Sequence, residues 1–87
     1  MTSQIKRAVV SIVSNIAEST SRMSLKEQIR FIEISYGSAL EVYCQLIIAL
    51  DLQYINEIDF QEMNEKIKTI TKQLNALKNS QTKRLNQ

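Results

Sequence analysis

The chain has 87 residues, of which 44% are hydrophobic, and it carries a formal net charge of +2. This length indicates a single domain, and the hydrophobic content excludes a wholly disordered chain. With one glycine and no proline, there are too few turn residues for a sheet-rich fold, so the composition favours long helices joined by few connections.

Two further features bear on the cellular compartment. The single cysteine excludes an internal disulfide bond, and the N-terminal residues do not show the apolar stretch of a signal peptide. The longest uninterrupted apolar run, residues 46–50, is far too short to span a membrane. We therefore expect a cytoplasmic protein with no membrane partner.

The first expected helix covers residues 2–22. Apolar side chains recur along it at spacings of three and four and form one face: Ile5, Val9, Ile12, Val13 and Ile16. A line of polar residues runs beside this face at helical spacing: Arg7, Ser11, Asn15, Glu18 and Arg22. The spacing leaves open whether this line is a solvated flank or a contact surface.

Residues 24–52 are expected to form the central helix. This segment carries two apolar stripes where a surface helix needs only one, which predicts that it is covered on two sides. Ser24 and Glu27 fit a capping box at its start. Gly37 lies near its middle, where glycine costs about 0.5–1 kcal/mol relative to alanine, and its small size predicts the close approach of another helix.

The last expected helix covers residues 59–79. Asp59 and Glu62 fit a second capping box, and Ile58 and Met63 are spaced as a hydrophobic staple across it. We expect residues 80–87 to form a frayed basic tail. The sequence therefore predicts one all-α domain over residues 1–87, an antiparallel up-and-down bundle with three helices.

The residue types present argue against catalysis. There is no histidine, which removes the usual general base and the commonest metal ligand, and one cysteine cannot build a zinc site. We expect no catalytic residues, no metal and no cofactor. A carboxylate-based enzyme is the one catalytic alternative, and it requires Glu18 and Glu41 to converge in a pocket.

The charges are unevenly distributed along the chain. Residues 1–59 hold five Lys and Arg against seven Asp and Glu, whereas residues 60–87 hold six against two. Basic side chains bind phosphate groups without any sequence motif. The candidates for nucleic-acid binding are Lys6, Arg7, Arg22, Lys26, Arg30, Lys66, Lys72 and Lys78. The alternative is that these charges serve only solubility.

Two stretches resemble the bacterial four-helix bundle proteins, also called 23S rRNA intervening-sequence proteins. Residues 2–18 resemble the family signature at Gln4, Arg7-Ala8, Ser11, Asn15 and Ala17-Glu18, and residues 31–41 resemble a second motif that ends in Gly37-Ser38-Ala39-Leu40-Glu41. Leu52-Gln53-Tyr54-Ile55 is similar to a turn of the family. The sequence departs from the family at Val13, where proline is usual, and at Ser19, where glycine is usual. The family also carries a further helix before this signature, which is not seen in this sequence.

The resemblance implies a helical bundle that assembles as a homo-oligomer, characteristically a pentamer, without enzymatic activity. A related branch serves diversity-generating retroelements as an accessory protein, which implies RNA or a nucleoprotein such as a reverse transcriptase as the partner. Five polar residues of the motifs are expected to form an inter-helix network that fixes the helix register: Ser11, Asn15, Glu18, Ser38 and Glu41.

Two functions remain open. One is an RNA- or nucleoprotein-binding accessory module, and the other is a purely structural or protein-interaction subunit that binds no nucleic acid. Self-association is expected in both cases, because a two-striped central helix with two partners leaves apolar surface uncovered. Salt dependence separates the two functions, because phosphate binding weakens steeply with salt.

Overall fold

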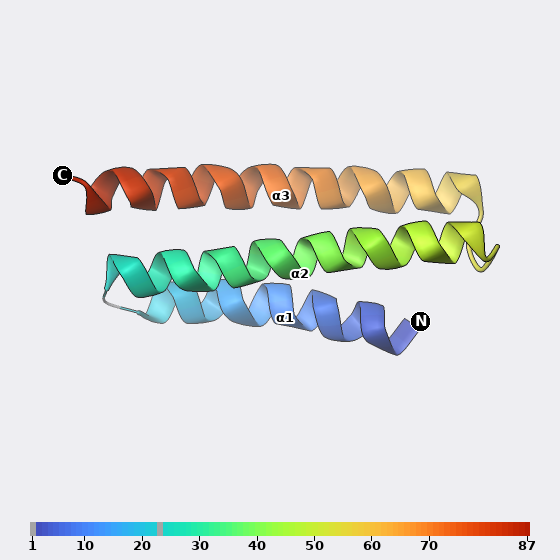
Figure 1. Ribbon diagram of the computed structural model, residues 1–87, viewed down its shortest axis with the longest axis horizontal. Coiled ribbons are helices and arrows are strands. Elements are labelled where there is room, and N and C mark those ends of the chain that lie inside the picture. The colour runs from blue at the N-terminus through green and yellow to red at the C-terminus, as the bar shows by residue number, and fades with distance from the viewer. Residues whose placement is uncertain (1, 23) are drawn as a thin grey trace.

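The computed structural model describes residues 2–22 and 24–87, with the side chains of residues 2 and 3 left out, and within these ranges it contains three helices and no strand. They are α1 (Thr2–Ser21), α2 (Leu25–Asp51) and α3 (Glu57–Leu85). The helices lie side by side with α2 in the middle, and the two connections lie at opposite ends of a rod of 48 × 20 × 13 Å (Figure 1). The all-α fold and the central position of the second helix are confirmed.

The core is built around α2, which packs against α1 on one side and α3 on the other. Five apolar residues of α2 are almost fully buried, and all of them except Ala49 belong to the main hydrophobic cluster: Ile32, Ala39, Val42 and Leu46. Ala8 and Ile12 of α1 and Ile67 and Leu74 of α3 complete the same cluster. By length and composition alone, α2 is long and apolar enough to cross a membrane, a test that core helices of soluble proteins also pass.

The first helix runs without interruption through the two positions at which the sequence departs from the family pattern. Val13 and Ser19 both lie inside α1, which ends only at Ser21. Without proline at position 13 there is no missing backbone donor to break the helix. Ser19 is buried, and as a residue with a Cβ it does not favour the left-handed conformation with which glycine ends helices.

The two ends of α2 are fixed by different devices. At the start, the Ser24 hydroxyl accepts a hydrogen bond from the backbone N–H of Glu27 over 3.4 Å, which confirms the Ser24 half of the predicted capping box. The Glu27 carboxylate lies 4.0 Å from the Arg22 guanidinium instead. At the end, the backbone N–H of Tyr54 donates to the Ala49 carbonyl (2.8 Å) and that of Gln53 to the Leu50 carbonyl (3.0 Å). This is the bonding pattern of a Schellman motif, and Gln53 accordingly has a positive φ of 62°.

The start of α3 corrects the sequence prediction. The N-cap is Asn56, not Asp59, and the Asn56 Oδ1 atom accepts a hydrogen bond from the Asp59 backbone N–H over 2.7 Å. Asparagine caps a helix as well as aspartate does, and with the earlier start Asp59 lies in the first turn, where its charge favours the helix dipole. The predicted staple is wrong too: Ile58 is 74% exposed, whereas Ile55 and Phe60 pack against the core.

The end of α3 also differs from the sequence prediction. Residues 80–85, expected to be part of a frayed tail, continue the helix to Leu85. Lys83 and Arg84 lie in the last turn, where cations favour the negative end of the helix dipole. The Asn86 backbone N–H then bonds back to the Thr82 carbonyl over 3.1 Å.

Gly37 does not mark a close approach between helices. The residue is exposed, and a Cβ atom built on it meets no neighbouring heavy atom within 4 Å. The small residues that allow α1 and α2 to pack closely lie elsewhere: Ala8 and Ser35 are both buried between the two helices, and Ser35 bonds to the Ile12 carbonyl.

Candidate functional site

Three of the five residues predicted to form an inter-helix polar network do form one. The hydroxyl oxygens of Ser11 and Ser38 lie 2.9 Å apart and join α1 to α2. The Asn15 amide donates to the Ser11 carbonyl (2.7 Å) and to the Ser11 hydroxyl (3.1 Å). Asn15 therefore orients Ser11, and Ser11 makes the contact between the helices.

The other two predicted members lie outside this network. Glu18 forms an ion pair over 3.0 Å with Arg22, which directly follows α1. Glu41 lines an open polar cleft of 360 Å³ between α1 and α2, together with Arg7, Ser11 and Ser38. Glu18 does not line this cleft, so the two carboxylates do not converge in one pocket.

Sequence reasoning missed one polar contact. Ser35 is fully buried and donates its hydroxyl to the backbone carbonyl of Ile12 over 3.1 Å. Its position among the apolar residues of α2 was a signal that it faces the core.

One end of the rod collects basic residues from α2, from α3 and from the connection that follows α1. The end of α1, the start of α2 and the end of α3 lie together there (Figure 1). We call this the basic end and define it by six residues: Arg22, Lys26, Arg30, Lys78, Lys83 and Arg84. Four of the six were predicted for nucleic-acid binding, and the helical tail adds Lys83 and Arg84.

The acidic residues near this end form ion pairs with only two of its six cations, Arg22 and Lys78. Arg22 lies 3.0 Å from Glu18 and 4.0 Å from Glu27, and its guanidinium carbon lies 5.1 Å from the centre of the Phe31 ring. Lys78 of α3 pairs with Glu33 of α2 over 3.4 Å. Among the described residues, no ion pair is formed by the other four cations: Lys26, Arg30, Lys83 and Arg84.

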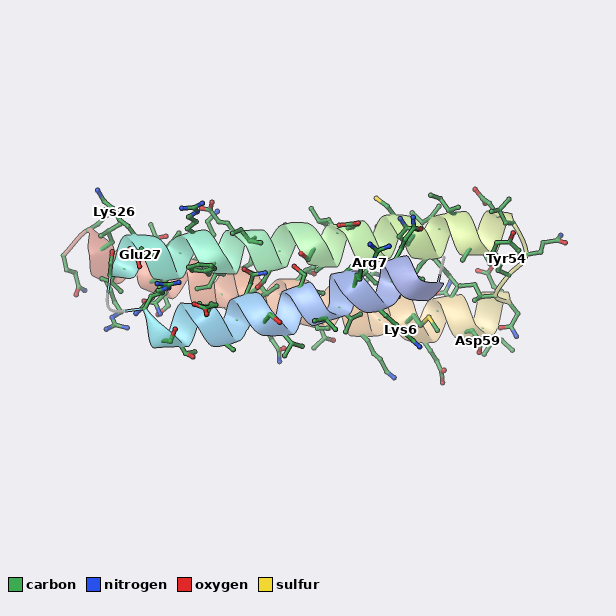
Figure 2. The ribbon with its side chains drawn as sticks, turned by 90° about the horizontal axis from the view of Figure 1, so that it is seen from below. Lys6, Arg7, Lys26, Glu27, Tyr54 and Asp59 are labelled. Carbon is green, nitrogen blue, oxygen red and sulfur yellow. The ribbon has the colours of Figure 1, made fainter. Side chains whose placement is uncertain are left out.

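The remaining predicted cations are not part of this cluster. Lys6 and Arg7 lie near the start of α1, well away from Lys26 along the rod (Figure 2). Lys66 lines a groove between α1 and α3, and Lys72 is exposed on α3. The structure therefore divides the eight predicted residues into Arg22, Lys26, Arg30 and Lys78 at the basic end and four others elsewhere.

The opposite end of the rod is acidic. Residues 44–65, which close α2 and open α3, contain no lysine or arginine. We call this the acidic end and define it by its five carboxylates: Asp51, Glu57, Asp59, Glu62 and Glu65. Figure 2 shows Tyr54 and Asp59 at this end and Lys26 and Glu27 at the other.

The chemistry that this arrangement supports is charge recognition. Lysine and arginine side chains that have no acidic partner are suited to phosphate oxygens. In the described part of the chain, no three histidine, cysteine or acidic residues come together as a metal site.

A comparison with protein families gave a match over most of the chain. A family model described as 23S rRNA-intervening sequence protein matches residues 1–76, which include α1, α2 and most of α3. The chain belongs to this family. A comparison with curated proteins gave no match. In this 23S rRNA-intervening sequence protein, the match covers the Ser11–Ser38 network and the start of the basic end at Arg22, Lys26 and Arg30, whereas Lys78, Lys83 and Arg84 follow it.

Proposed function

We propose that this 23S rRNA-intervening sequence protein is a non-enzymatic module that assembles with copies of itself and binds RNA, free or within a nucleoprotein, through its basic end. The proposal includes the antiparallel up-and-down course of the three helices. The subunit count that the family resemblance suggests is five.

The observation that carries the proposal is the set of unpaired cations at the basic end. The acidic side chains near this end form ion pairs with Arg22 and Lys78. Lys26 and Arg30 of α2 therefore have no acidic partner in the described structure. Lys26 lies in the first turn of α2, where a cation opposes the helix dipole at a cost of about 0.3–1 kcal/mol. A bound phosphate would offset this cost.

RNA binding is tested by fluorescence anisotropy of a labelled 23S rRNA fragment, with an unrelated RNA of equal length beside it. We expect the affinity to fall linearly with salt on logarithmic axes, because each neutralised phosphate releases a counterion. In the double variant K26Q/R30Q, two contacts are lost, so the slope should decrease by about 1.4–1.8. The folded state should persist, because both changes are on exposed residues.

The matched control is K6Q/R7Q, which removes one lysine and one arginine from the start of α1. It changes the net charge by the same amount but leaves the basic end intact. Its slope should stay close to that of the unchanged protein. Equal losses in the two variants would show that binding follows net charge alone, and absence of binding at low salt would overturn RNA binding.

The second candidate function, a structural or protein-interaction subunit, is favoured by a different observation. Large apolar side chains are exposed on every helix, among them Val10 and Val13 of α1 and Ile48 of α2. Such surface is normally covered by another protein. For this function we expect a salt-insensitive assembly that carries no RNA.

A further inference from the structure

The polar cleft between α1 and α2 brings several kinds of chemical group to one small space. Its inner residues are the buried Ala8 and the half-buried Ser11 and Ser38, and its volume is 360 Å³. Cavities that hold small organic molecules begin at about 300 Å³. The cleft therefore has room for one group of that size. All of its lining residues belong to one chain, so the site is complete in each subunit whatever their number.

The rim of the cleft carries one cation and one anion that do not pair with each other. Arg7 of α1 and Glu41 of α2 both line the cleft, and both are exposed. Among the residues that the structure describes, neither forms an ion pair. Figure 2 shows Arg7 on the side of α1 that faces α2, whereas the adjacent Lys6 extends away from α2. The lining is therefore neutral overall, with a charged donor and a charged acceptor both available.

The two serines of the cleft leave one further proton available. The Ser11 and Ser38 hydroxyls share one hydrogen bond of 2.9 Å, in which only one of them is the donor. The Ser11 hydroxyl also accepts from the Asn15 amide over 3.1 Å, which uses a lone pair and not the hydroxyl proton. Whichever serine donates to the other, the second hydroxyl keeps a proton that the described contacts do not use.

The balance of charge indicates what kind of group fits the cleft. A phosphate would meet the Glu41 carboxylate, and an amine would meet the Arg7 guanidinium, so a like charge disfavours either of them. A neutral group is favoured if it has hydrogen-bond acceptors on one edge and donors on the next. Nucleic-acid bases have this chemistry, and unpaired bases are the part of RNA that proteins read by sequence.

Guanine matches the two charged groups better than the other bases do. Its O6 and N7 atoms accept two hydrogen bonds from an arginine guanidinium, which is the commonest specific contact to any base. Its N1–H and N2–H groups donate side by side and suit the two oxygens of a carboxylate. Adenine and cytosine offer one exocyclic amino group and uracil one ring N–H, so none of them has two neighbouring donor atoms.

We propose that the cleft receives the base of one unpaired guanosine, with Arg7 on its O6 and N7 atoms and Glu41 on its N1–H and N2–H groups. The inference rests on the RNA binding of the proposed function and adds a base preference to it. The basic end holds the RNA backbone. Arg30 precedes Glu41 by three helical turns, about 16 Å, on the same side of α2, so one strand can reach both.

Contacts to a base and contacts to the backbone differ in their salt dependence. A guanine base is uncharged, so loss of its contact with Arg7 lowers the affinity without changing the salt slope. The variant K6Q/R7Q is therefore still expected to keep the slope of the unchanged protein. It should lose the preference for guanine.

Fluorescence anisotropy with two short oligouridines, identical except for one central guanosine, tests the base preference. Both strands carry the same number of phosphates, so the basic end binds them alike. We expect the strand with guanosine to bind about 5- to 150-fold more tightly, the range for one bidentate contact between a side chain and a base. Inosine at the same place lacks the N2 amino group and should reduce the preference.

The variant E41Q tests the carboxylate. It keeps the size of the side chain but leaves one acceptor where there were two, so the difference between guanosine and inosine should disappear. Its affinity for plain oligouridine should persist. The matched control is D51N, which removes one negative charge from an exposed residue of the same helix that does not line the cleft. It should retain the preference, and circular dichroism should show unchanged helix content in both variants.

The outcomes separate the cleft from the basic end. Equal affinity of the unchanged protein for the two strands, with the expected salt slope, overturns the guanine site and leaves RNA binding standing. A preference for guanosine that E41Q retains also overturns the site in the cleft.

If neither strand binds at low salt, RNA binding is overturned, and isothermal titration with guanosine monophosphate tests the cleft alone. Binding that is lost in E41Q and kept in D51N would support the guanine site and identify a free nucleotide as its ligand. Absence of binding would overturn the guanine site as well.

Discussion

Ser35 of α2 donates its hydroxyl to the main-chain carbonyl of Ile12 in α1 across 3.1 Å, and none of its surface is exposed. A serine side chain reaches a backbone atom of the neighbouring helix only where the two helices pack closely. Ala8 of α1, also buried and also small, is part of the same core. This contact sets the separation of α1 and α2.

Enlarging Ser35 should therefore force the helices apart. We expect S35L to lower the free energy of unfolding by about 1–3 kcal/mol, because a close-packed core has no room for the added atoms. S35A, which loses only the hydrogen bond, should cost about 0.5–1.5 kcal/mol. Urea denaturation followed by circular dichroism at fixed protein concentration measures both. The control S14L, at an exposed position of α1, should change the stability by less than about 0.5 kcal/mol.

The helices could be predicted from the sequence because their apolar spacing is regular and turn residues are rare. Their ends were less predictable, because several residues compete for each cap. Asn56 and Asp59 are both good N-caps, and only the packing of Ile55 and Phe60 against the core decides between them. The tail could not be placed from apolar spacing at all, since the stability of its last turn comes from charge and backbone bonding.

The Ser11–Ser38 contact should be measurable as a coupling between two helices. A double-mutant cycle of S11A and S38A is expected to give a coupling energy of about 0.5–1.5 kcal/mol, since the two hydroxyls bond directly. N15A should weaken the same coupling, because Asn15 holds the Ser11 hydroxyl in place over 3.1 Å. Additive single effects, within about 0.3 kcal/mol, would contradict a role in fixing the helix register.

Most of the basic residues of the candidate site could be predicted from the sequence, but their grouping at one end of the rod could not. Along the sequence, residues 1–59 are slightly acidic and residues 60–87 are basic. The fold instead joins the end of α2 to the start of α3 and segregates charge along the rod. The start of α2 and the end of α3 therefore lie at the same end of the rod although they are far apart in sequence. Which cations remain unpaired depends on contacts between helices, such as Lys78 with Glu33, that spacing within one helix does not contain.

Gln53 occupies a position at which glycine should be more stable. Its φ of 62° lies in the left-handed region, which costs a residue with a Cβ roughly 1–2 kcal/mol. Q53G keeps both backbone bonds of the Schellman motif and should raise the free energy of unfolding by about 1 kcal/mol, less the extra chain entropy of glycine in the unfolded state. Thermal denaturation measures the gain, and Q53A serves as a control that should give none. A decrease in stability with Q53G would show that the Gln53 side chain makes a stabilising contact.

Gly37 presents the reverse case, a glycine where the fold of one chain does not require one. It lies inside α2, its φ is not positive, and a Cβ would meet nothing within 4 Å. G37A should therefore raise the free energy of unfolding by about 0.5–1 kcal/mol, because alanine loses less backbone entropy in a helix. For a domain of this size, 1 kcal/mol corresponds to roughly 4–8 °C in the melting temperature. If G37A instead lowers the mass of the assembly in light scattering while its helix content is unchanged, the exposed face of α2 around Gly37 packs against another copy. That result would place an interface on the side opposite the groove and explain the glycine by contact between chains.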